Sequence, residues 1–153
     1  MLNELCAECR NYFLREYSNT SKYIHEGTYT IENGTIQDLP FLKNGQYYRI
    51  VGSTFNDGVW KYGDATVTLV DETFDGVIWE MFVPPAFVAL AAEIKQWTLD
   101  NAQTLASPYQ SESFGGYSYS LKSGGSAGSA DAGLTWQAQF ASRLKPYRRL
   151  SVL

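Results

Sequence analysis

Few side chains in this 153-residue sequence could carry covalent or metal chemistry. Cys6 and Cys9 have the C-x-x-C spacing of zinc and redox sites, but a zinc site needs about four ligands and His25 is the only histidine. A redox pair lies at the start of a helix that follows a strand, whereas these cysteines lie within an N-terminal pattern of helical spacing. We therefore expect two small, buried apolar side chains.

The stretch DETFDG, Asp71–Gly76, gathers three carboxylates that could bind calcium or assist hydrolysis. It lacks the D-x-[DN]-x-[DN]-G spacing of a calcium loop, so we expect a solvated hairpin turn. A hydrolase that uses Asp71, Glu72 and Asp75 stays open as one alternative function. His25 lies in a polar stretch and is expected to be an exposed loop side chain, not a catalytic base. We expect no enzyme activity, no metal and no cofactor.

The composition indicates one globular domain. The hydrophobic fraction is 44% and the aromatic fraction 15%, which is sufficient for a core. A net charge of −4 argues against binding of nucleic acid through bulk positive charge. The sequence has neither a run of 18 apolar residues nor the apolar region of a secretory signal, so we expect no membrane span and synthesis in the cytosol.

Three segments have the apolar spacing of helices. Residues 2–17 form an amphipathic pattern, residues 84–103 begin with two prolines that suit a first helical turn, and residues 132–145 repeat large apolar residues every four positions. Pro146 is expected to end the last helix.

Between the first two helices, residues 28–83 have the β-branched and aromatic content of strands. Asn33-Gly34 is typical of a type I′ hairpin turn. Asn56-Asp57-Gly58 and Asp75-Gly76 are further turn signals. We predict a compact antiparallel β unit of roughly four to six strands.

Two C-terminal segments lack such spacing. Residues 107–130 are rich in glycine and serine, which favours a flexible chain, yet they contain several aromatic residues. Residues 111–120 are expected to be mobile in the free protein and to order as an added strand on assembly. Residues 123–133 are expected to act as a tether for the last helix and the tail. Residues 146–153 form a basic and apolar tail that suits insertion into another subunit.

The C-terminal half combines SPYQSESFGGYSYS, then a glycine-serine gap, then a helix that ends in RLKPYRRL. In these motifs the sequence resembles the head–tail connector (adaptor) proteins of tailed bacteriophages. LKNGQYYRIVGSTFNDGVWKY and LVDETFDGVIWEMFVPPAFVALAAEI are similar to a β insertion in connectors of phages with Gram-positive hosts. The long spacer SGGSAGSADAG departs from the family pattern.

This resemblance implies an α+β fold, a small bundle of three main helices with an inserted antiparallel β unit of hairpins and an extended C-terminal arm. It also implies a ring of about twelve copies beneath the portal protein, in contact with a stopper or tail-terminator protein. The ring would be part of the virion, assembled in the host cytoplasm. Packaged DNA would pass through its lumen without sequence-specific binding, and the acidic balance of the chain suits such a lumen.

Two sets of contact residues are predicted. Contacts to the portal or a neighbouring subunit are assigned to Ser111, Phe114, Gly115, Gly116, Tyr117, Tyr119, Tyr147, Arg148, Arg149 and Leu150. Contacts to the neck, the tail or the capsid are assigned to Phe55, Asn56, Asp57, Phe74 and Asp75, in turns expected to point away from the helices.

One alternative from another class stays open. A carbohydrate- or surface-binding β module of a phage tail or baseplate would use aromatic side chains on strands as a stacking platform. Its candidate residues are Tyr47, Tyr48, Trp60 and Trp79.

Overall fold

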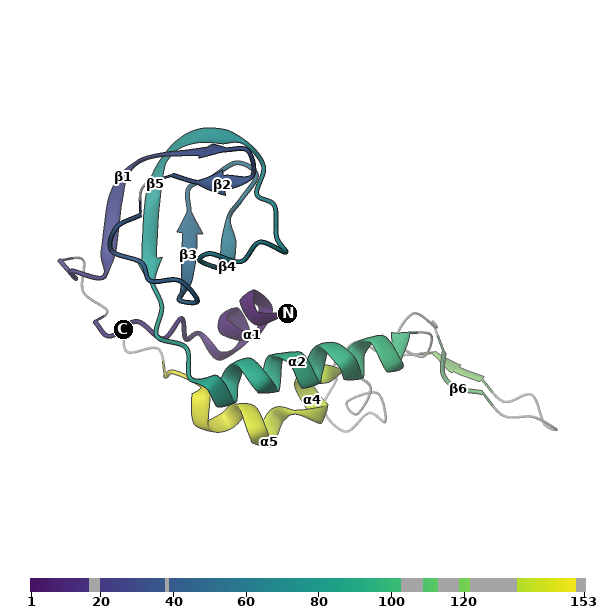
Figure 1. Cartoon of the computed structure of the whole chain (residues 1–153). Helices are drawn as coiled ribbons and strands as arrows, with labels where there is room; N and C mark the ends of the chain where they lie inside the picture. The colour runs from purple at the N-terminus through teal and green to yellow at the C-terminus, as the bar shows by residue number, and fades with distance from the viewer. Residues whose placement is uncertain (17–19, 38, 103–108, 113–118, 122–134, 151–153) are drawn as a thin grey trace. The chain divides into compact units, whose positions relative to one another are not determined.

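The computed structural model describes residues 1–16, 20–37, 39–102, 109–112, 119–121 and 135–150. The chain forms two compact units, Leu2–Pro85 and Ala86–Leu153, and Met1 belongs to the second (Figure 1). None of the helices in the described residues is long and apolar enough to cross a membrane.

The first unit is a five-stranded antiparallel sheet in the order β2-β1-β5-β3-β4. The strands are β1 (Ile24–Glu32), β2 (Thr35–Ile36), β3 (Tyr47–Val51), β4 (Gly58–Lys61) and β5 (Glu72–Glu80). Figure 1 shows β5 curving over the top of this unit, so that the sheet curls into a half-barrel. Its edges are β2 and β4.

The predicted turn at Asn33-Gly34 is confirmed. Both residues have positive φ angles, 54° and 74°, as a type I′ turn requires. The turn joins β1 to β2, with Glu32 opposite Thr35. Asparagine and glycine tolerate this conformation at small cost, which explains why the local sequence is sufficient to specify it.

The predicted turn at Asp75-Gly76 is wrong, because β5 continues through both residues. Gly76 lies directly opposite Gly27 in β1. A Cβ atom at Gly76 would lie 2.3 Å from the carbonyl oxygen of Val51, so only glycine lets β3 approach β5 this closely. The dipeptide therefore marks a bend within one long strand, where the sheet curls.

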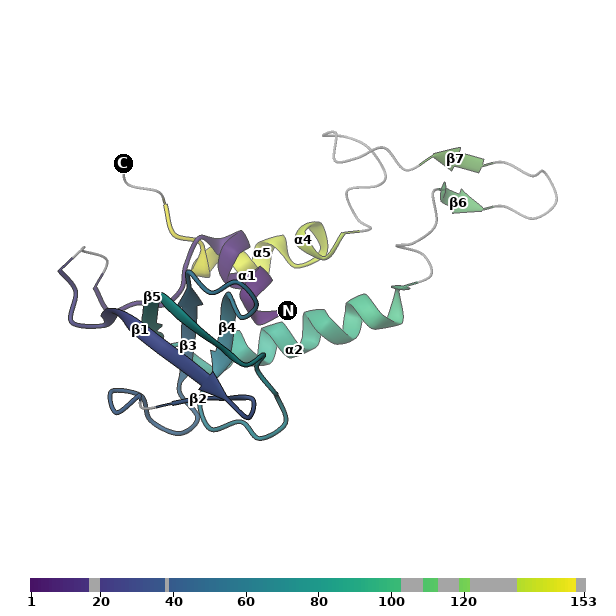
Figure 2. The ribbon, with the colours of Figure 1, turned by 90° about the horizontal axis from the view of Figure 1, so that it is seen from above.

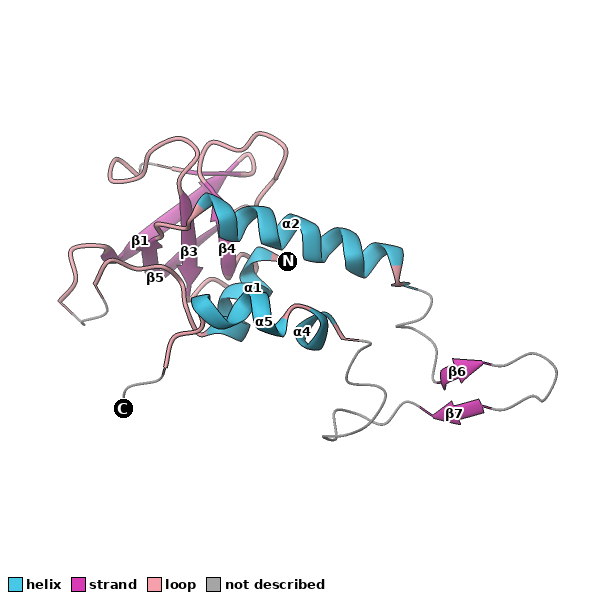
Figure 3. Ribbon diagram, turned by 90° about the horizontal axis from the view of Figure 1, so that it is seen from below, coloured by secondary structure: helices cyan, strands magenta, loops and turns pink. Residues whose placement is uncertain are grey.

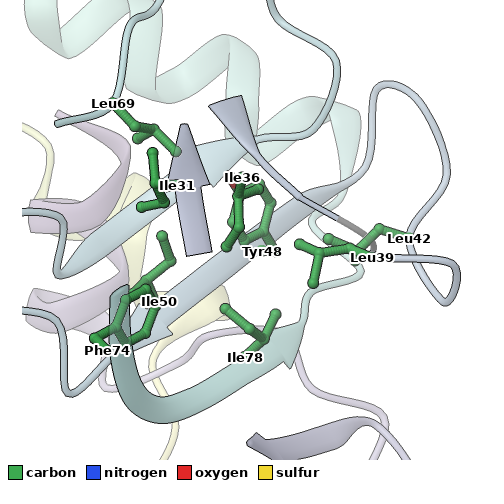
Figure 4. Close-up of a cluster of buried hydrophobic side chains, with 9 residues drawn as sticks. All are labelled: Ile31, Ile36, Leu39, Leu42, Tyr48, Ile50, Leu69, Phe74 and Ile78. Atoms are coloured by element: carbon green, nitrogen blue, oxygen red, sulfur yellow. The ribbon is translucent and has the colours of Figure 1, made fainter. Parts of the chain in front are cut away.

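The core of this unit lies inside the curl. Figure 4 shows the buried side chains that converge from the strands and from the loops that follow β2 and precede β5. They are Ile31, Ile36, Leu39, Leu42, Tyr48, Ile50, Leu69, Phe74 and Ile78. Alternate residues of β3 and β5 point into this cluster, as the period of a strand dictates, so the opposite face of each strand is left for other contacts.

Helix α1 (Leu2–Cys9) is half as long as the expected helix over residues 2–17. Arg10 has φ 51°, and the N–H groups of Arg10 and Asn11 donate to the carbonyl oxygens of Ala7 and Cys6. This is a Schellman motif, which ends a helix. The apolar pattern continues beyond it because Tyr12 packs edge-on against Trp79, with ring centroids 5.6 Å apart.

The second unit contains helix α2 (Pro85–Asp100), the short helices α4 (Trp136–Gln139) and α5 (Ala141–Leu144), and the 3₁₀ helix η2 (Lys145–Tyr147) (Figure 3). The expected helix over residues 132–145 is interrupted at Phe140. The ring of Phe140 packs against Trp97 of α2 at 6.0 Å. Strands β6 (Tyr109–Glu112) and β7 (Tyr119–Leu121) lie side by side as an antiparallel pair (Figure 2).

The predicted fold class is therefore wrong in its architecture. The chain is α+β, but its largest element is the curled five-stranded half-barrel, and the helices apart from α2 are short. It is not a three-helix bundle that carries a β insertion. The error has two causes: α1 ends at the left-handed Arg10, and the last helical pattern is divided into short helices.

Candidate functional site

The β3–β4 turn, residues 53–57, is held by its own polar groups and is called here the Phe55 turn. The Ser53 N–H donates to the Asp57 carboxylate at 2.8 Å, and the Asn56 N–H donates to the Ser53 hydroxyl at 2.7 Å. The indole N–H of Trp60 donates to the carbonyl oxygen of Asn56 at 2.7 Å. These bonds fix the turn in one conformation on the sheet.

The carboxylate of Glu72, at the start of β5, also holds this turn. Glu72 accepts a hydrogen bond from the Ser53 hydroxyl and a second from the Phe55 N–H, the latter at 3.1 Å. The Phe55 ring is nevertheless 65% exposed, and Val70, whose backbone bonds to Asn56, is 51% exposed. The turn thus presents an apolar aromatic side chain to solvent on a rigid backbone.

Residues 64–71, between β4 and β5, begin with a turn and contain no helix or strand; this segment is called here the strap. Its first turn is closed by Asp64, which accepts from the N–H and the hydroxyl of Thr66 at 2.9 and 2.6 Å. The hydrogen bonds from Thr66, followed by the charge of Lys61, hold the pKa of Asp64 below its ordinary value.

The far end of the strap is bonded to the β1–β2 turn. The Leu69 N–H donates to the carbonyl oxygen of Gly34, and the Asp71 carboxylate accepts from the N–H groups of Asn33 and Gly34 at 3.1 and 2.8 Å. The buried Leu69 side chain joins the core. The strap therefore joins the end of β4, at one edge of the sheet, to the β1–β2 turn at the other edge.

A pocket of about 320 Å³ lies between the strap and the sheet. Its aromatic wall is formed by Tyr48, Trp60 and Tyr62, and the rings of Tyr48 and Tyr62 meet edge-on at 6.1 Å. Burial raises the pKa of Tyr48. The remaining lining comes from Gly34, Thr35, Ile36, Asn44, Lys61, Gly63, Asp64, Ala65, Val67 and Leu69. The pocket has an aromatic interior and polar groups among its other walls.

The predicted neck and capsid contacts divide into exposed and buried residues. Phe55 and Asp57 are exposed on the turn, and Asp75 is exposed on β5, where it accepts from the Thr28 hydroxyl. Asn56 is 1% exposed and Phe74 is 8% exposed within the core. Their side chains cannot form an outer surface, because Asn56 bonds the strap and Phe74 points inside the curl.

The predicted C-terminal contacts divide in a similar way. The ring of Tyr147 packs against Phe87 of α2 at 4.9 Å and is half-buried. Arg148 begins an extended stretch, Arg149 is exposed, and Leu150 is 84% exposed. The carboxylate of Glu93 pairs bidentately with Arg143 at 2.7 and 2.8 Å. The arm therefore begins after Tyr147, on a helix that is bonded to α2.

Only part of the predicted docking segment falls on described residues. Ser111 pairs with Ser120, and Tyr119 pairs with Glu112, in the β6–β7 hairpin. The predictions for Phe114, Gly115, Gly116 and Tyr117, and for the tether, lie outside the described residues. In the described residues β6 and β7 pair with each other, and the ordering of residues 111–120 on assembly stays a prediction.

The cysteines and the histidine that were considered for chemistry lie within elements of the fold. Cys6 and Cys9 are buried in α1 and form no disulfide, and burial raises the pKa of Cys6 to about 12. His25 is not an exposed loop residue but part of β1. Its Nε2 lies 2.7 Å from Glu80 Oε1, and its ring stacks on Phe41. In the described residues, no three His, Cys, Asp or Glu side chains come together as metal ligands.

The aromatic platform of the alternative hypothesis is not assembled. Tyr48 is buried in the core, and only Trp60 of the remaining three lines the pocket. Trp79 packs against Tyr12, and the guanidinium of Arg49 lies 4.5 Å from the Trp79 ring centroid. Neighbouring residues Tyr47 and Tyr48 point to opposite faces of β3. These four side chains therefore offer no common stacking surface.

The fold and these surfaces define an α+β protein with two units: a β half-barrel that carries a rigid exposed aromatic turn and a strap pocket, and a helical unit with a basic and apolar arm. Comparisons with protein-family models, with curated proteins and with solved structures find no match to this chain.

Proposed function

We propose that this chain is a head–tail connector (adaptor) of a tailed bacteriophage. Copies of it form a ring beneath the portal protein, continue the DNA channel and join the head to a stopper or tail-terminator protein. The observation that carries the proposal is the paired motif SESFGGYSYS and PYRRL. The whole resemblance extends from about Leu5 to Leu150.

The C-terminal arm supports the proposal on physical grounds. Tyr147 packs on α2, and the chain then becomes extended and places an apolar leucine in solvent. An exposed apolar side chain beside two arginines is typical of a segment that a partner covers. Arginines pair with carboxylates bidentately, so the arm suits an acidic groove on a neighbouring protein.

The pair between Glu93 and Arg143 supports the same role. It joins α5 to α2 directly before the arm begins. A binding arm that leaves from a fixed helix loses less conformational freedom on docking than one that leaves from a loose chain. We infer that this helical pairing positions the arm for the portal.

Deletion of residues 148–153 tests the proposal. Tyr147 is kept because its ring packs on Phe87. We expect a folded protein, measured by circular dichroism and thermal unfolding, that no longer joins filled heads to tails in a joining assay with purified particles. Leu99→Ala removes another exposed leucine, from α2, and is expected to join heads to tails normally. Normal joining by the truncated protein would contradict the proposal.

Electron microscopy of the full chain gives an independent test. Rings of the purified protein, or rings on portal-bearing heads, are expected. Particles that contain this protein only outside the neck would contradict its assignment as a connector.

A further inference from the structure

We propose that the Phe55 side chain of one copy inserts into the strap pocket of the next copy. This contact would be the main link between copies of the half-barrel unit. The inference rests on the proposed function, because a connector ring requires a contact of the chain with itself.

The Phe55 turn has the properties of a preformed binding element. Its backbone is held by Glu72 and by the pairing of Asn56 with Val70, while its ring stays largely in solvent. Aromatic residues on rigid supports dominate binding energies, because they bury a large area and lose little conformational freedom on binding. An exposed phenylalanine with this degree of support is best explained by a partner that receives it.

The strap pocket fits one aromatic ring. An apolar cavity of about 150 Å³ accommodates benzene, and this pocket is about 320 Å³. Trp60, Tyr62 and Tyr48 would surround an entering ring with edge-to-face contacts, the geometry that aromatic pairs prefer. Val67, on the strap, is exposed and would cover its side.

The contact must be made between copies. The Phe55 backbone is fixed and its ring is exposed, so it does not fill the pocket of its own chain. The turn and the pocket are different patches of one unit, and a contact between different patches is heterologous. Heterologous contacts build closed rings when the rotation between copies closes, which is the assembly that the proposed function needs.

A crosslinking experiment tests the contact directly. Phe55→Cys and Ala65→Cys place one thiol on the turn and one on the pocket lining, while the native Cys6 and Cys9 are buried. We expect a short bismaleimide to link the two single variants when they are mixed. The double variant should form a ladder of higher oligomers. Leu99→Cys mixed with Ala65→Cys is the control and should give no such link.

Two further variants test the energy of the contact by sedimentation of the full chain. Phe55→Ala should weaken self-association by about tenfold or more, and Phe55→Leu should weaken it less. Ala65→Trp, which fills the pocket while Phe55 stays intact, should have the same effect as Phe55→Ala. Absence of the specific crosslink, or self-association that neither Phe55→Ala nor Ala65→Trp changes, would overturn the inference.

The same variants separate this inference from the proposed function. If the unaltered chain joins heads to tails and Phe55→Ala forms the same rings, the contact between Phe55 and the strap pocket is wrong and the connector function stands. If the crosslinks form but virion necks lack the protein, the contact stands and the connector function is wrong.

Discussion

The Asn56 side chain pairs with the backbone of Val70 as a neighbouring strand would. Its Nδ2 donates to the Val70 carbonyl oxygen and its Oδ1 accepts from the Val70 N–H, both at 2.8 Å. The Asn56 backbone meanwhile closes the turn that carries Phe55. One buried amide thus connects the Phe55 turn to the strap, and with it the two surfaces that we assign to self-association.

Replacement of Asn56 should destabilise the half-barrel. Asn56→Ala removes both bonds to Val70 and is expected to lower the free energy of unfolding by about 2–3 kcal/mol. Asn56→Asp keeps the shape, but it turns a carboxylate oxygen toward the Val70 carbonyl and should cost at least as much. Urea denaturation measures both. The exposed Asn44→Ala is the matched control, expected to stay within about 0.5 kcal/mol of the unaltered chain.

The two glycines that face each other across β1 and β5 should respond differently to a methyl group. At Gly76 the added Cβ would lie 2.3 Å from the Val51 carbonyl oxygen, whereas at Gly27 it meets only the Tyr29 ring at 3.7 Å. We expect Gly76→Ala to lower the free energy of unfolding by about 3 kcal/mol and Gly27→Ala to be tolerated. Equal losses in thermal unfolding would contradict the bend that we assign to Gly76.

Elements fixed by local chemistry could be predicted from the sequence. Asn33-Gly34 adopts its turn because both residues accept positive φ angles. Helix α2 was expected over 84–103 and spans Pro85–Asp100, since Pro85 suits a first turn and its apolar spacing is regular. In both cases the signal lies within a few neighbouring residues.

Elements that depend on distant partners could not be predicted in this way. Asp75-Gly76 has the composition of a turn, and only the approach of Val51 shows why glycine is needed within a strand. Asn56 reads as a turn residue, but its side chain bonds to a strap 14 positions away. No short pattern in the sequence signals the strap pocket, because its walls come from four separate stretches of chain.

The buried thiol of Cys6 should be unreactive in the folded protein. Burial raises its pKa to about 12, so at pH 8 only on the order of one molecule in 10⁴ carries the thiolate, which is the nucleophile. We expect negligible labelling by a thiol reagent at pH 8 and labelling of two thiols per chain in urea. Phe55→Cys is the internal control, because its exposed thiol should react at once. Rapid labelling of the unaltered folded chain would contradict the packing of α1.

The pair between Glu93 and Arg143 should make the stability of the helical unit depend on pH in acid. The hydrogen bond from Arg143, and then its charge, lower the pKa of Glu93 from its ordinary 4.5. A depressed folded-state pKa means that the stabilisation is fully present above the unfolded-state value and is lost as the pH falls through the folded-state value. Thermal unfolding between pH 7 and pH 3 should therefore show a larger loss of stability in the unaltered chain than in Glu93→Gln. Because both side chains are exposed, high salt should reduce the difference in stability at pH 7.

Gln96→Ala on the same helix is the control for the loss of a polar surface group, and it should follow the unaltered chain in its pH dependence. Identical pH profiles for Glu93→Gln and the unaltered chain would show that the pair does not hold α5 on α2, and the arm would then need another support.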